Sequence, residues 1–484
     1  MPAKEGPSRE GAAGRWWARA AACLGMLLAG CGSLPPRADR APEFATPSRA
    51  ALASKLVVEA PGGRLHSAQR RQLLARLDAD SPSSDVLKRQ LAGMTQVAAG
   101  QDESVVLHAD NAARLLVDGP QTFQAMFAAL EAARDTVLLE SYIIDDAELA
   151  KQFADVLIRR TQAGVRTYVL YDAVGSIGTS KAYFDALRSQ GVLVCEYNPL
   201  NPLKRPGYWN IVQRDHRKIL VVDERLAYTG GINISHVYAE GSAPLTPSRT
   251  KEDPGERGWR DTQVELRGPA ASALAGLVRQ TWQDQGCQGV MPPAAPVARA
   301  AGDKVVQVIP TSPDGQPSRI YLSLLTAIDA SRSSVHLSMA YFAPGRDMLD
   351  ALCDASRRGV DVVLLLPSVS DFTPVLNAGR SYYAGLLECG VRIYELQGAL
   401  LHAKTAVIDK VWSTVGSSNM DWLSFARNNE VNVVVLGEDF AGDMDAQFQR
   451  DLAASQQVTA QQWAKRPVGD RIKQWFSRLA ERLF

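Results

Sequence analysis

The stretch HRKILVVD at residues 216–223, followed six residues later by GGIN at 230–233, occurs a second time in this chain. The second copy is HAKTAVID at residues 402–409, followed six residues later by GSSN at 416–419. Both copies read H-x-K-x4-D-x6-G-[GS]-x-N, and chance does not explain two full copies in a chain with only six histidines. The repeat predicts two halves that each bring an imidazole, an ammonium and an amide to one shared site.

The residues after each H-x-K are apolar and largely β-branched, which predicts a strand. Because residues i and i+2 share one face of a strand, the His and Lys of each motif point the same way. The glycines allow close backbone approach, and the Asn offers an amide N–H2. Lysine and asparagine donors without an acidic ligand set suit a phosphate. The predicted phosphate-binding residues are Lys218, Asn233, Lys404, Ser417 and Asn419.

Two histidines that face one phosphorus atom can divide the work of a phosphodiester exchange. One imidazole, neutral, attacks phosphorus, and the other, protonated, gives its proton to the departing alkoxide; the roles reverse when an alcohol or water attacks. Histidine fits because its pKa lies near neutrality. Each ring needs its other nitrogen held, and Glu430 and Asp261 stand in matching places just before apolar strands. The alternative is that both are solvated charges at a strand start.

The paired motif resembles the phospholipase D superfamily, most closely its bacterial cardiolipin synthase and transphosphatidylase branch. The likeness covers roughly residues 105–455. The flanking segments that carry it are ESYIID at 140–145, NP at 198–199, WRD at 259–261 and NMD at 419–421. A lone H-x-K is more often an ordinary strand face, and an inactive relative would have lost a His or Lys from one copy, which has not happened here.

This resemblance implies an α/β fold of two tandem phospholipase D-like α/β/α sandwich domains, related by a pseudo-twofold, with the active site at their interface. It implies that His216 is the nucleophile and His402 the general acid, that Asp223 and Asp409 lie behind the site, and that no metal or other cofactor is needed. The expected catalytic set is His216, Lys218, Asp223, His402, Lys404, Asp409, Asp261 and Glu430.

The repeat extends beyond the motifs, because three pairs of segments in the two halves match. Each half alternates strands and helices, which indicates an α/β sandwich with a partly parallel sheet. The matching pairs are 137–144 with 335–342, 164–172 with 359–367 and 191–197 with 390–396. The predicted units are a signal peptide at 1–30, a tether and helical cap at 31–104, a first domain at 105–286, a linker at 287–302, a second domain at 303–455 and an amphipathic tail at 456–484.

The N-terminus has the pattern of a bacterial lipoprotein export signal. A basic lead-in precedes a short apolar run, and LAGC at residues 28–31 matches the lipobox that would place a diacylglyceryl group on Cys31. Gly32 follows instead of Asp, which favours a lipid-anchored protein of the outer membrane facing the periplasm. The alternative is a fortuitous cysteine after an apolar run.

The charge balance favours lipid over nucleic acid as the partner. The whole chain has a net charge of +1, and removal of residues 1–30, with four basic and two acidic side chains, leaves 49 basic and 50 acidic. A nuclease more often carries a basic excess to meet a polyanion. The sequence therefore predicts phospholipid substrates and a membrane surface as partners, and no nucleic acid.

Two other segments have the composition of membrane contacts. Ile472, Trp475, Phe476, Leu479 and Leu483 fall on one helical face with basic neighbours, which suits either a membrane surface or packing on the domain. The insertion at residues 199–210, just before the first motif, carries four apolar residues that suit contact with acyl chains or the bilayer surface. These are Leu200, Leu203, Tyr208 and Trp209. The alternative is an ordinary ordered loop.

Four cysteines follow Cys31, and an oxidising periplasm permits them to pair in three ways. Cys195 and Cys389 border apolar strands, which favours buried free thiols at these two positions. The four histidines outside the motifs, His66, His108, His236 and His336, are expected to be surface or satisfied core residues.

The sequence as a whole predicts a membrane-anchored phosphatidyltransferase with phosphatidylglycerol as donor, a phosphatidyl-His216 intermediate and cardiolipin as product. Three alternatives stay open at this point. They are a hydrolytic phospholipase D that releases phosphatidic acid, a metal-independent phosphodiesterase acting on nucleic acid, and a lipoprotein that binds lipid without turnover.

Overall fold

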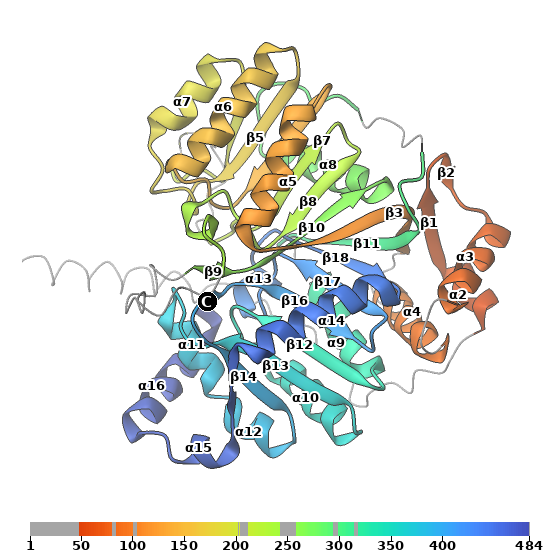
Figure 1. Ribbon diagram of the computed structural model, residues 1–484, viewed down its shortest axis with the longest axis vertical. Helices are drawn as coiled ribbons and strands as arrows, with labels where there is room; N and C mark the ends of the chain where they lie inside the picture. The colour runs from red at the N-terminus through yellow and green to blue at the C-terminus, as the bar shows by residue number, and fades with distance from the viewer. Residues whose placement is uncertain are drawn as a thin grey trace, which may run out of the picture.

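Two α/β halves of similar build are stacked along the long axis of the molecule (Figure 1). This is seen in a computed structural model that describes residues 48–79, 84–99, 104–201, 203, 212–242, 258–293, 299–313 and 318–483. The predicted signal peptide and Cys31 lie outside the described residues, as do Tyr208 and Trp209. In the described part of the chain, no helix is both long and apolar enough to cross a bilayer.

The sheet of the first half has the order β6-β5-β4-β7-β8-β10-β3. β4, β5 and β6 are parallel, and the remaining neighbours are antiparallel. The strands are β3 (Val105–Val117), β4 (Thr136–Ser141), β5 (Arg166–Asp172), β6 (Leu193–Tyr197), β7 (Lys218–Val222), β8 (Leu226–Gly230) and β10 (Thr262–Arg267).

The sheet of the second half repeats this order as β14-β13-β12-β16-β17-β18-β11. Again three strands are parallel, and the others alternate in direction. The strands are β11 (Lys304–Thr311), β12 (Ser334–Met339), β13 (Asp361–Pro367), β14 (Arg392–Leu396), β16 (Lys404–Ile408), β17 (Trp412–Gly416) and β18 (Glu430–Leu436).

Helices cover both faces of each sheet, because buried strand residues alternate between two apolar clusters. In the first half, α5, α6 and α7 pack on one face and α8 on the other; in the second, α9, α10 and α12 oppose α14. The helices are α5 (Asp118–Ala132), α6 (Glu148–Gln162), α7 (Lys181–Ser189), α8 (Pro269–Asp284), α9 (Arg319–Ala330), α10 (Arg346–Arg357), α11 (Thr373–Arg380), α12 (Tyr383–Glu388), α13 (Trp422–Ala426) and α14 (Glu438–Ala453). The predicted fold class of two tandem α/β/α sandwiches is confirmed.

The two halves share both backbone pairing and core. β3 pairs with β10 along one part of its length and with β11 of the second half along another, so that the strands form one 17-stranded sheet. One buried cluster contains Val221 and Val264 of the first half together with Val415 and Val433 of the second. The relative position of the halves, and of any site between them, is therefore held by packed apolar surface.

The segments on either side of the two halves are folded. At the N-terminal side, where we expected a tether with a helical cap, β1 adds a parallel strand to β3, and α4 packs on α9. At the C-terminal side, β19 pairs with β14. These elements are α2 (Arg49–Lys55), β1 (Leu56–Ala60), β2 (Gly63–Arg64), α3 (Ser67–Ala79), α4 (Ser84–Ala99), β19 (Ser455–Val458), α15 (Ala460–Ala464), α16 (Val468–Leu479) and the short 3-10 helix η4 (Glu481–Leu483).

The prediction of free thiols at Cys195 and Cys389 is wrong. Cys195 on β6 forms a disulfide with Cys287, which follows α8, and Cys389 at the end of α12 forms one with Cys353 of α10. Both residues are only half-buried, so bordering an apolar strand did not place them in the core. The Cα atoms are 5.7 and 5.4 Å apart, within the range that a disulfide spans.

Candidate active site

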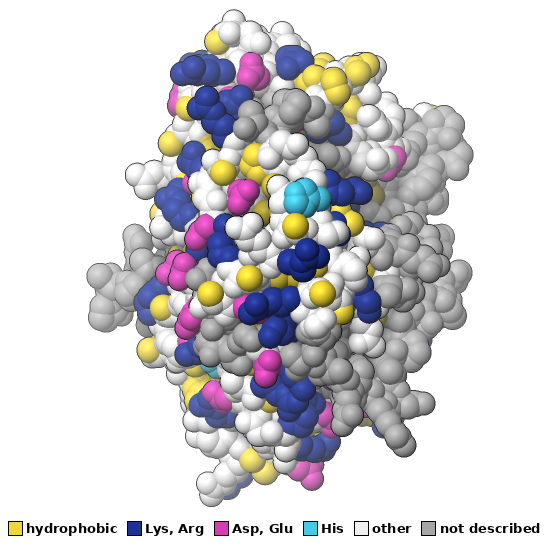
Figure 2. Space-filling model, turned by 90° about the vertical axis from the view of Figure 1, so that its right-hand side faces the viewer, with side chains coloured by type: hydrophobic (Ala, Val, Ile, Leu, Met, Phe, Trp, Pro, Cys, Tyr) yellow, Lys and Arg dark blue, Asp and Glu magenta, His cyan; other side chains and the backbone are white. Residues whose placement is uncertain are grey.

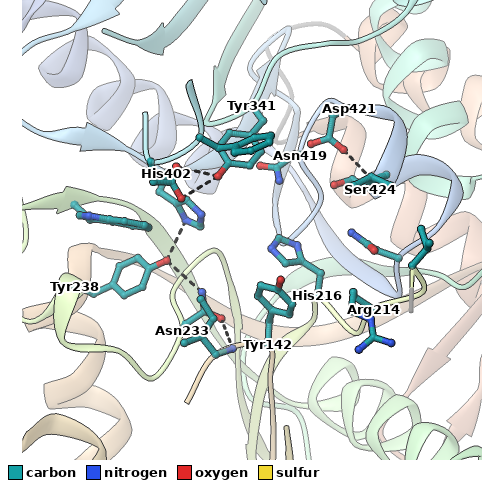
Figure 3. Close-up of a pocket in the computed structure, with 17 residues that line it drawn as sticks. Tyr142, Arg214, His216, Asn233, Tyr238, Tyr341, His402, Asn419, Asp421 and Ser424 are labelled. Carbon is teal, nitrogen blue, oxygen red and sulfur yellow. Dashed lines mark hydrogen bonds between the residues drawn. The ribbon is translucent and has the colours of Figure 1, made fainter. Parts of the chain in front are cut away.

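One cavity of about 430 Å³ lies where the two halves meet, and both motif histidines line it (Figure 3). His216 lies two residues before β7, and His402 lies two residues before β16, so the two H-x-K segments deliver their histidines to the same place. The other lining residues are Tyr142, Ile143, Val212, Arg214, Asn233, Tyr238, Trp259, Tyr341, Asp371, Phe372, Asn419, Asp421, Leu423, Ser424 and Asn428.

His216 is held by the second half of the chain. Its backbone N–H donates to the carbonyl of Asn429 at 2.9 Å, and Asp215 forms a parallel bridge with Asn429. This pairing brings Glu430, the first residue of β18, behind the ring, where its two carboxylate oxygens lie 3.0 and 3.1 Å from Nδ1. The carboxylate is fully buried, so it is a fixed partner of the imidazole and not a solvated strand-start charge.

His402 is held by the first half in the matching way. Its N–H donates to the carbonyl of Arg260 at 2.8 Å, next to the short parallel pair of β9 (Trp259–Arg260) and β15 (Leu400–Leu401). Nδ1 lies 2.7 Å from Oδ2 of Asp261. Each histidine therefore takes its carboxylate from the opposite half, an exchange that the sequence leaves unspecified.

Tyr238 is a second neighbour of the His402 ring. Its hydroxyl lies 3.1 Å from Nδ1 and accepts a hydrogen bond from Asn233 Nδ2 at 3.2 Å (Figure 3). The Tyr238 side chain comes from the 3-10 helix η2 (His236–Tyr238), and burial raises its pKa well above the usual value. The ring of His402 thus has a hydroxyl partner that His216 lacks among the hydrogen bonds seen here.

The first pair favours a neutral imidazole beside a charged carboxylate. Burial lowers the pKa of His216, and the nearby Glu430 carboxylate opposes this effect. Burial would raise the pKa of Glu430, but His216, Lys218 and the hydrogen bond from Ser417 outweigh it, so the pKa is lowered. A neutral ring whose Nδ1–H donates to Glu430 leaves the lone pair on Nε2 free.

The second pair is poised differently. Burial and the nearby Lys404 ammonium lower the pKa of His402 well below its usual value. Burial raises the pKa of Asp261 to about 6, although Lys404 and Arg260 act in the opposite direction. The imidazolium form of His402 is therefore a stronger acid than an ordinary histidine until further negative charge enters the pocket.

The two motif lysines lie beneath the histidines and are almost fully buried. Lys218 Nζ donates to the carbonyl of His216 at 2.6 Å, and Lys404 Nζ donates to the carbonyl of His402 at 2.5 Å. Burial lowers both pKa values, that of Lys218 to about 7. Neither lysine lines the cavity itself; each instead donates to the backbone of its own histidine.

The predicted phosphate-binding amides line the cavity, but Ser417 does not. Asn233 Oδ1 accepts from the N–H of Ile143, and Asn419 has a buried Oδ1 without a hydrogen-bond partner. The Ser417 hydroxyl instead donates to Glu430 at 2.5 Å, so its expected role is corrected from phosphate contact to support of the carboxylate. In the first motif, Gly231 occupies the position that Ser417 has in the second. A Cβ at Gly231 would lie 2.1 Å from Asp261 Oδ1, so a side chain there would clash with the carboxylate.

The two motif aspartates lie away from the pocket, at the far ends of β7 and β16. Asp223 accepts hydrogen bonds from the backbone N–H groups of residues 134–136. Asp409 accepts from those of residues 332–334. Both tie the turn before a neighbouring parallel strand and lie behind the site, where the resemblance implies them to be.

Several pocket residues were not singled out from the sequence. Tyr142 lies within the ESYIID segment, and its ring meets that of His216 edge-on with centroids 4.9 Å apart. Tyr341 donates to Asp371 at 2.9 Å, in the loop after β13. Asp421 accepts from the N–H of Ser424 at the start of α13, and burial raises its pKa to about 6. Tyr142 and Asp421 fall in flanking segments that carry the family likeness, although no role was assigned to them; for Tyr341 and Asp371, position after a strand was the signal available.

In the described part of the chain, no three His, Cys, Asp or Glu side chains are grouped so that they could hold a metal ion. The four histidines outside the motifs do not line the cavity. Two of them have carboxylate partners at short distance: His236 pairs with Asp145 at 2.7 Å and His336 with Asp445 at 2.6 Å.

Comparison with known proteins identifies the family. Residues 324–452 match the family model described as cardiolipin synthase, phospholipase D-like domain. The chain is 34% identical over 369 residues to a cardiolipin synthase of Geobacillus kaustophilus, covering 75% of this chain and 71% of that protein. The chain belongs to the cardiolipin synthase family of the phospholipase D superfamily. The predicted resemblance is confirmed, and with it the expectation of a phosphatidyltransferase-type enzyme.

Two further similarities place this family member among its relatives. Cardiolipin synthase A of Pseudomonas aeruginosa is 33% identical over 351 residues, covering 72% of this chain and 69% of that protein. The crystal structure of a phosphatidylserine synthase from Haemophilus influenzae superposes with a TM-score of 0.59 at 11% identity, covering 81% of this chain and all of that one. At this identity the second similarity concerns the fold alone.

Proposed function

We propose that this family member transfers the phosphatidyl group of phosphatidylglycerol to the hydroxyl of a second phospholipid, giving cardiolipin, through a phosphatidyl-His216 intermediate. The observation that carries the proposal is the pair of histidines from opposite halves on one cavity, each backed by a buried carboxylate. Two imidazoles held in this way suit a two-step exchange at a single phosphorus atom.

The difference between the two histidine pairs supports the assignment of roles. Glu430, with a lowered pKa, stays ionised behind His216 and can stabilise the positive charge that develops on the ring during attack. His402, with its pKa well below the usual value, releases a proton readily once it carries one. His216 is therefore better suited to nucleophilic attack, and His402 to general acid catalysis.

The reaction proceeds in two balanced steps. Nε2 of His216 attacks phosphorus, the bond from phosphorus to the oxygen of the headgroup glycerol breaks, and the departing glycerol alkoxide takes the proton of His402. A phospholipid hydroxyl then attacks the phosphorus, gives its proton to His402, and the bond from phosphorus to nitrogen breaks. Asn233 and Asn419, at the cavity wall, are placed to donate to the equatorial oxygens.

The charge of a phosphodiester substrate accounts for how His402 acquires its proton. Burial lowers the pKa values of His402, Lys218 and Lys404. A phosphodiester adds a negative charge beside these groups and raises their pKa values. Binding of the donor is therefore coupled to proton uptake, and the general acid becomes charged when its substrate is in place.

The size of the cavity supports a lipid whose tails stay outside. About 430 Å³ lies within the range of sites that enclose a drug-sized ligand, which suits the phosphate and headgroup of a phospholipid. The acyl chains must then leave through the mouth. We also propose lipid anchoring at Cys31 in the outer membrane facing the periplasm, on the basis of the lipobox sequence; two acyl chains suffice for stable anchoring.

The proposal is tested by mass spectrometry of the products that the full chain makes on phosphatidylglycerol vesicles. Cardiolipin and free glycerol are expected, and His216→Ala lowers their rate of formation by at least about 10³-fold. His402→Asn lowers it by about 10²–10⁴-fold. His66→Ala, an exposed histidine of the N-terminal segment, is the matched control and keeps the parental rate.

Each other product pattern contradicts the proposal in a defined way. Phosphatidic acid without cardiolipin would replace the transferase by a hydrolytic phospholipase D. Cleavage of single-stranded DNA without added metal, at a rate above lipid turnover, would indicate a phosphodiesterase for nucleic acid. Lipid binding without turnover, unchanged in His402→Asn, would leave a binding protein.

A further inference from the structure

Exposed large hydrophobic side chains concentrate on α16. Five of the ten in the described part of the chain lie on this helix, with exposed fractions between 52% and 69%. Their spacing places them on one helical face. They are Val468, Ile472, Trp475, Phe476 and Leu479.

The opposite, polar face of α16 packs on the protein. Gln474 is 4% exposed and accepts a hydrogen bond from Arg466 at 3.0 Å. Arg478 stacks over the ring of Tyr382 at 4.8 Å from its centroid, and Glu481 accepts a hydrogen bond from the Tyr382 hydroxyl. A surface helix of a globular protein buries its apolar face; α16 does the reverse, so its apolar face is available to something else.

The charge around this face identifies the kind of partner. Residues 460–483 carry six basic and two acidic side chains, whereas the whole chain is almost neutral at +1. Arg471 and Lys473 flank the apolar face on its two sides and are exposed. Aromatic and aliphatic side chains bordered by Lys and Arg suit the interface of a bilayer that contains anionic lipids.

The position of α16 links it to the pocket. The helix packs along α11, which begins directly after the pocket residue Phe372 (Figure 1). Just past its end, Ala480 packs in a small apolar cluster with Tyr341 and Leu423, both of which line the cavity. Phe372 is itself 40% exposed, so an apolar side chain of the cavity wall also faces solvent.

We propose that α16 docks on an anionic phospholipid bilayer, inserts its apolar face among the lipids, and thereby holds the mouth of the pocket against the membrane that supplies the donor. The proposal deepens the function above, on which its account of the donor rests. It gives the acyl chains a place to stay, because a pocket that encloses only the polar part of a lipid must open onto an apolar medium.

Two features favour a bilayer over a second copy of the chain. In a symmetric dimer through α16, the basic flanks of one helix would face those of the other, and this repulsion opposes pairing. In a head-to-tail contact, α16 of one copy would need an apolar surface elsewhere on the other copy. The side turned away from α16 offers no comparable surface: its visible described hydrophobic side chains lie in small groups among charged and polar ones (Figure 2).

The test measures sedimentation of the full chain with vesicles, in a Cys31→Ser and His216→Ala background, so that neither an acyl anchor nor turnover contributes. Binding is expected to vesicles of phosphatidylglycerol and phosphatidylcholine in equal parts, and to weaken with added salt. Trp475→Ser with Phe476→Ser lowers the partition at least about tenfold. Val290→Ser, which removes a 92% exposed apolar side chain from the first half, leaves it unchanged.

Hydrogen exchange of the unsubstituted chain gives a measurement that does not depend on a variant's folding. The amides of α16 should become protected when these vesicles are added. No protection, or vesicle binding that the double variant retains, would overturn the proposal. A dimer that the double variant converts to a monomer, with vesicle binding unchanged, would overturn it in favour of a second copy.

The failure of this proposal and that of the transferase function can be told apart. In a Cys31→Ser background with His216 intact, the double variant should turn over short-chain phosphatidylglycerol at monomeric concentrations like the Cys31→Ser parent, while its turnover of vesicles falls about tenfold. Vesicle binding through α16 without any turnover would sink the function alone. Parental turnover of vesicles by the double variant would sink the membrane role of α16.

Discussion

Replacement of Glu430 by Gln tests the exchange of carboxylates between the halves. Both carboxylate oxygens lie within 3.1 Å of His216 Nδ1, and a hydrogen bond to a charged group contributes about 1.5–3 kcal/mol. Loss of this stabilisation alone slows attack by about 10–10²-fold. Gln can also present its N–H2 to Nδ1, which moves the ring proton to Nε2 and removes the nucleophile. We therefore expect a total loss of about 10²–10⁴-fold.

The assay is single-turnover formation of product from phosphatidylglycerol, with Ser417→Ala as the matched control. Ser417→Ala removes one hydrogen bond to Glu430 but keeps its charge, so a loss below about tenfold is expected. The charge of Glu430 opposes the lowering of the His216 pKa by burial. Because attack needs neutral His216, the acidic limb of the kcat/KM profile should move to lower pH in Glu430→Gln. A rate within about threefold of the parent, with an unmoved profile, would refute the reasoning.

Three further predictions concern stability. Asp223→Ala or Asp409→Ala should lower the free energy of unfolding by about 2–4 kcal/mol in urea titrations, because each removes three backbone hydrogen bonds, and should leave the kcat of the folded fraction unchanged. Lys218→Met should raise the stability at pH 7 by at least about 1 kcal/mol while activity is lost. Folding lowers the pKa of Lys218 to about 7, from about 10.4 in the unfolded chain. Between these two pH values the unfolded chain binds more protons than the folded one, so the buried ammonium destabilises the fold. Equal or lower stability of Lys218→Met would contradict this. Removal of the disulfide between Cys353 and Cys389, which closes a loop of 36 residues, should cost about 2–4 kcal/mol under non-reducing conditions, and no cost would show that the bond is absent.

Much of the architecture could be predicted from the repeat. The apolar, largely β-branched run after each H-x-K predicts β7 and β16, and the matched segments predict the parallel strands of both halves. The crossing of Glu430 to His216 could not be predicted, because it depends on the bridge between Asp215 and Asn429, more than two hundred residues apart in the chain. Local patterns carry no information on such a contact.

The remaining differences have similar causes. Ser417 is chemically able to bind either a phosphate or a carboxylate, and only the position of Glu430 decides between them. The pocket residue Asp371 comes from a loop, which has no periodicity to reveal it. The pattern of α16 shows that its faces differ in polarity, but which face is covered depends on packing against α11.

The most direct test of the account is to denature the full chain rapidly during turnover at mildly alkaline pH, where the bond between phosphorus and a histidine nitrogen survives, and to map the modified peptide by mass spectrometry. The account predicts a phosphatidyl group on the peptide that contains His216, absent from His216→Ala and still formed when the exposed His66 is replaced by Ala. A phosphatidyl group on His402, or turnover with no modified histidine, would contradict the division of labour between the two halves.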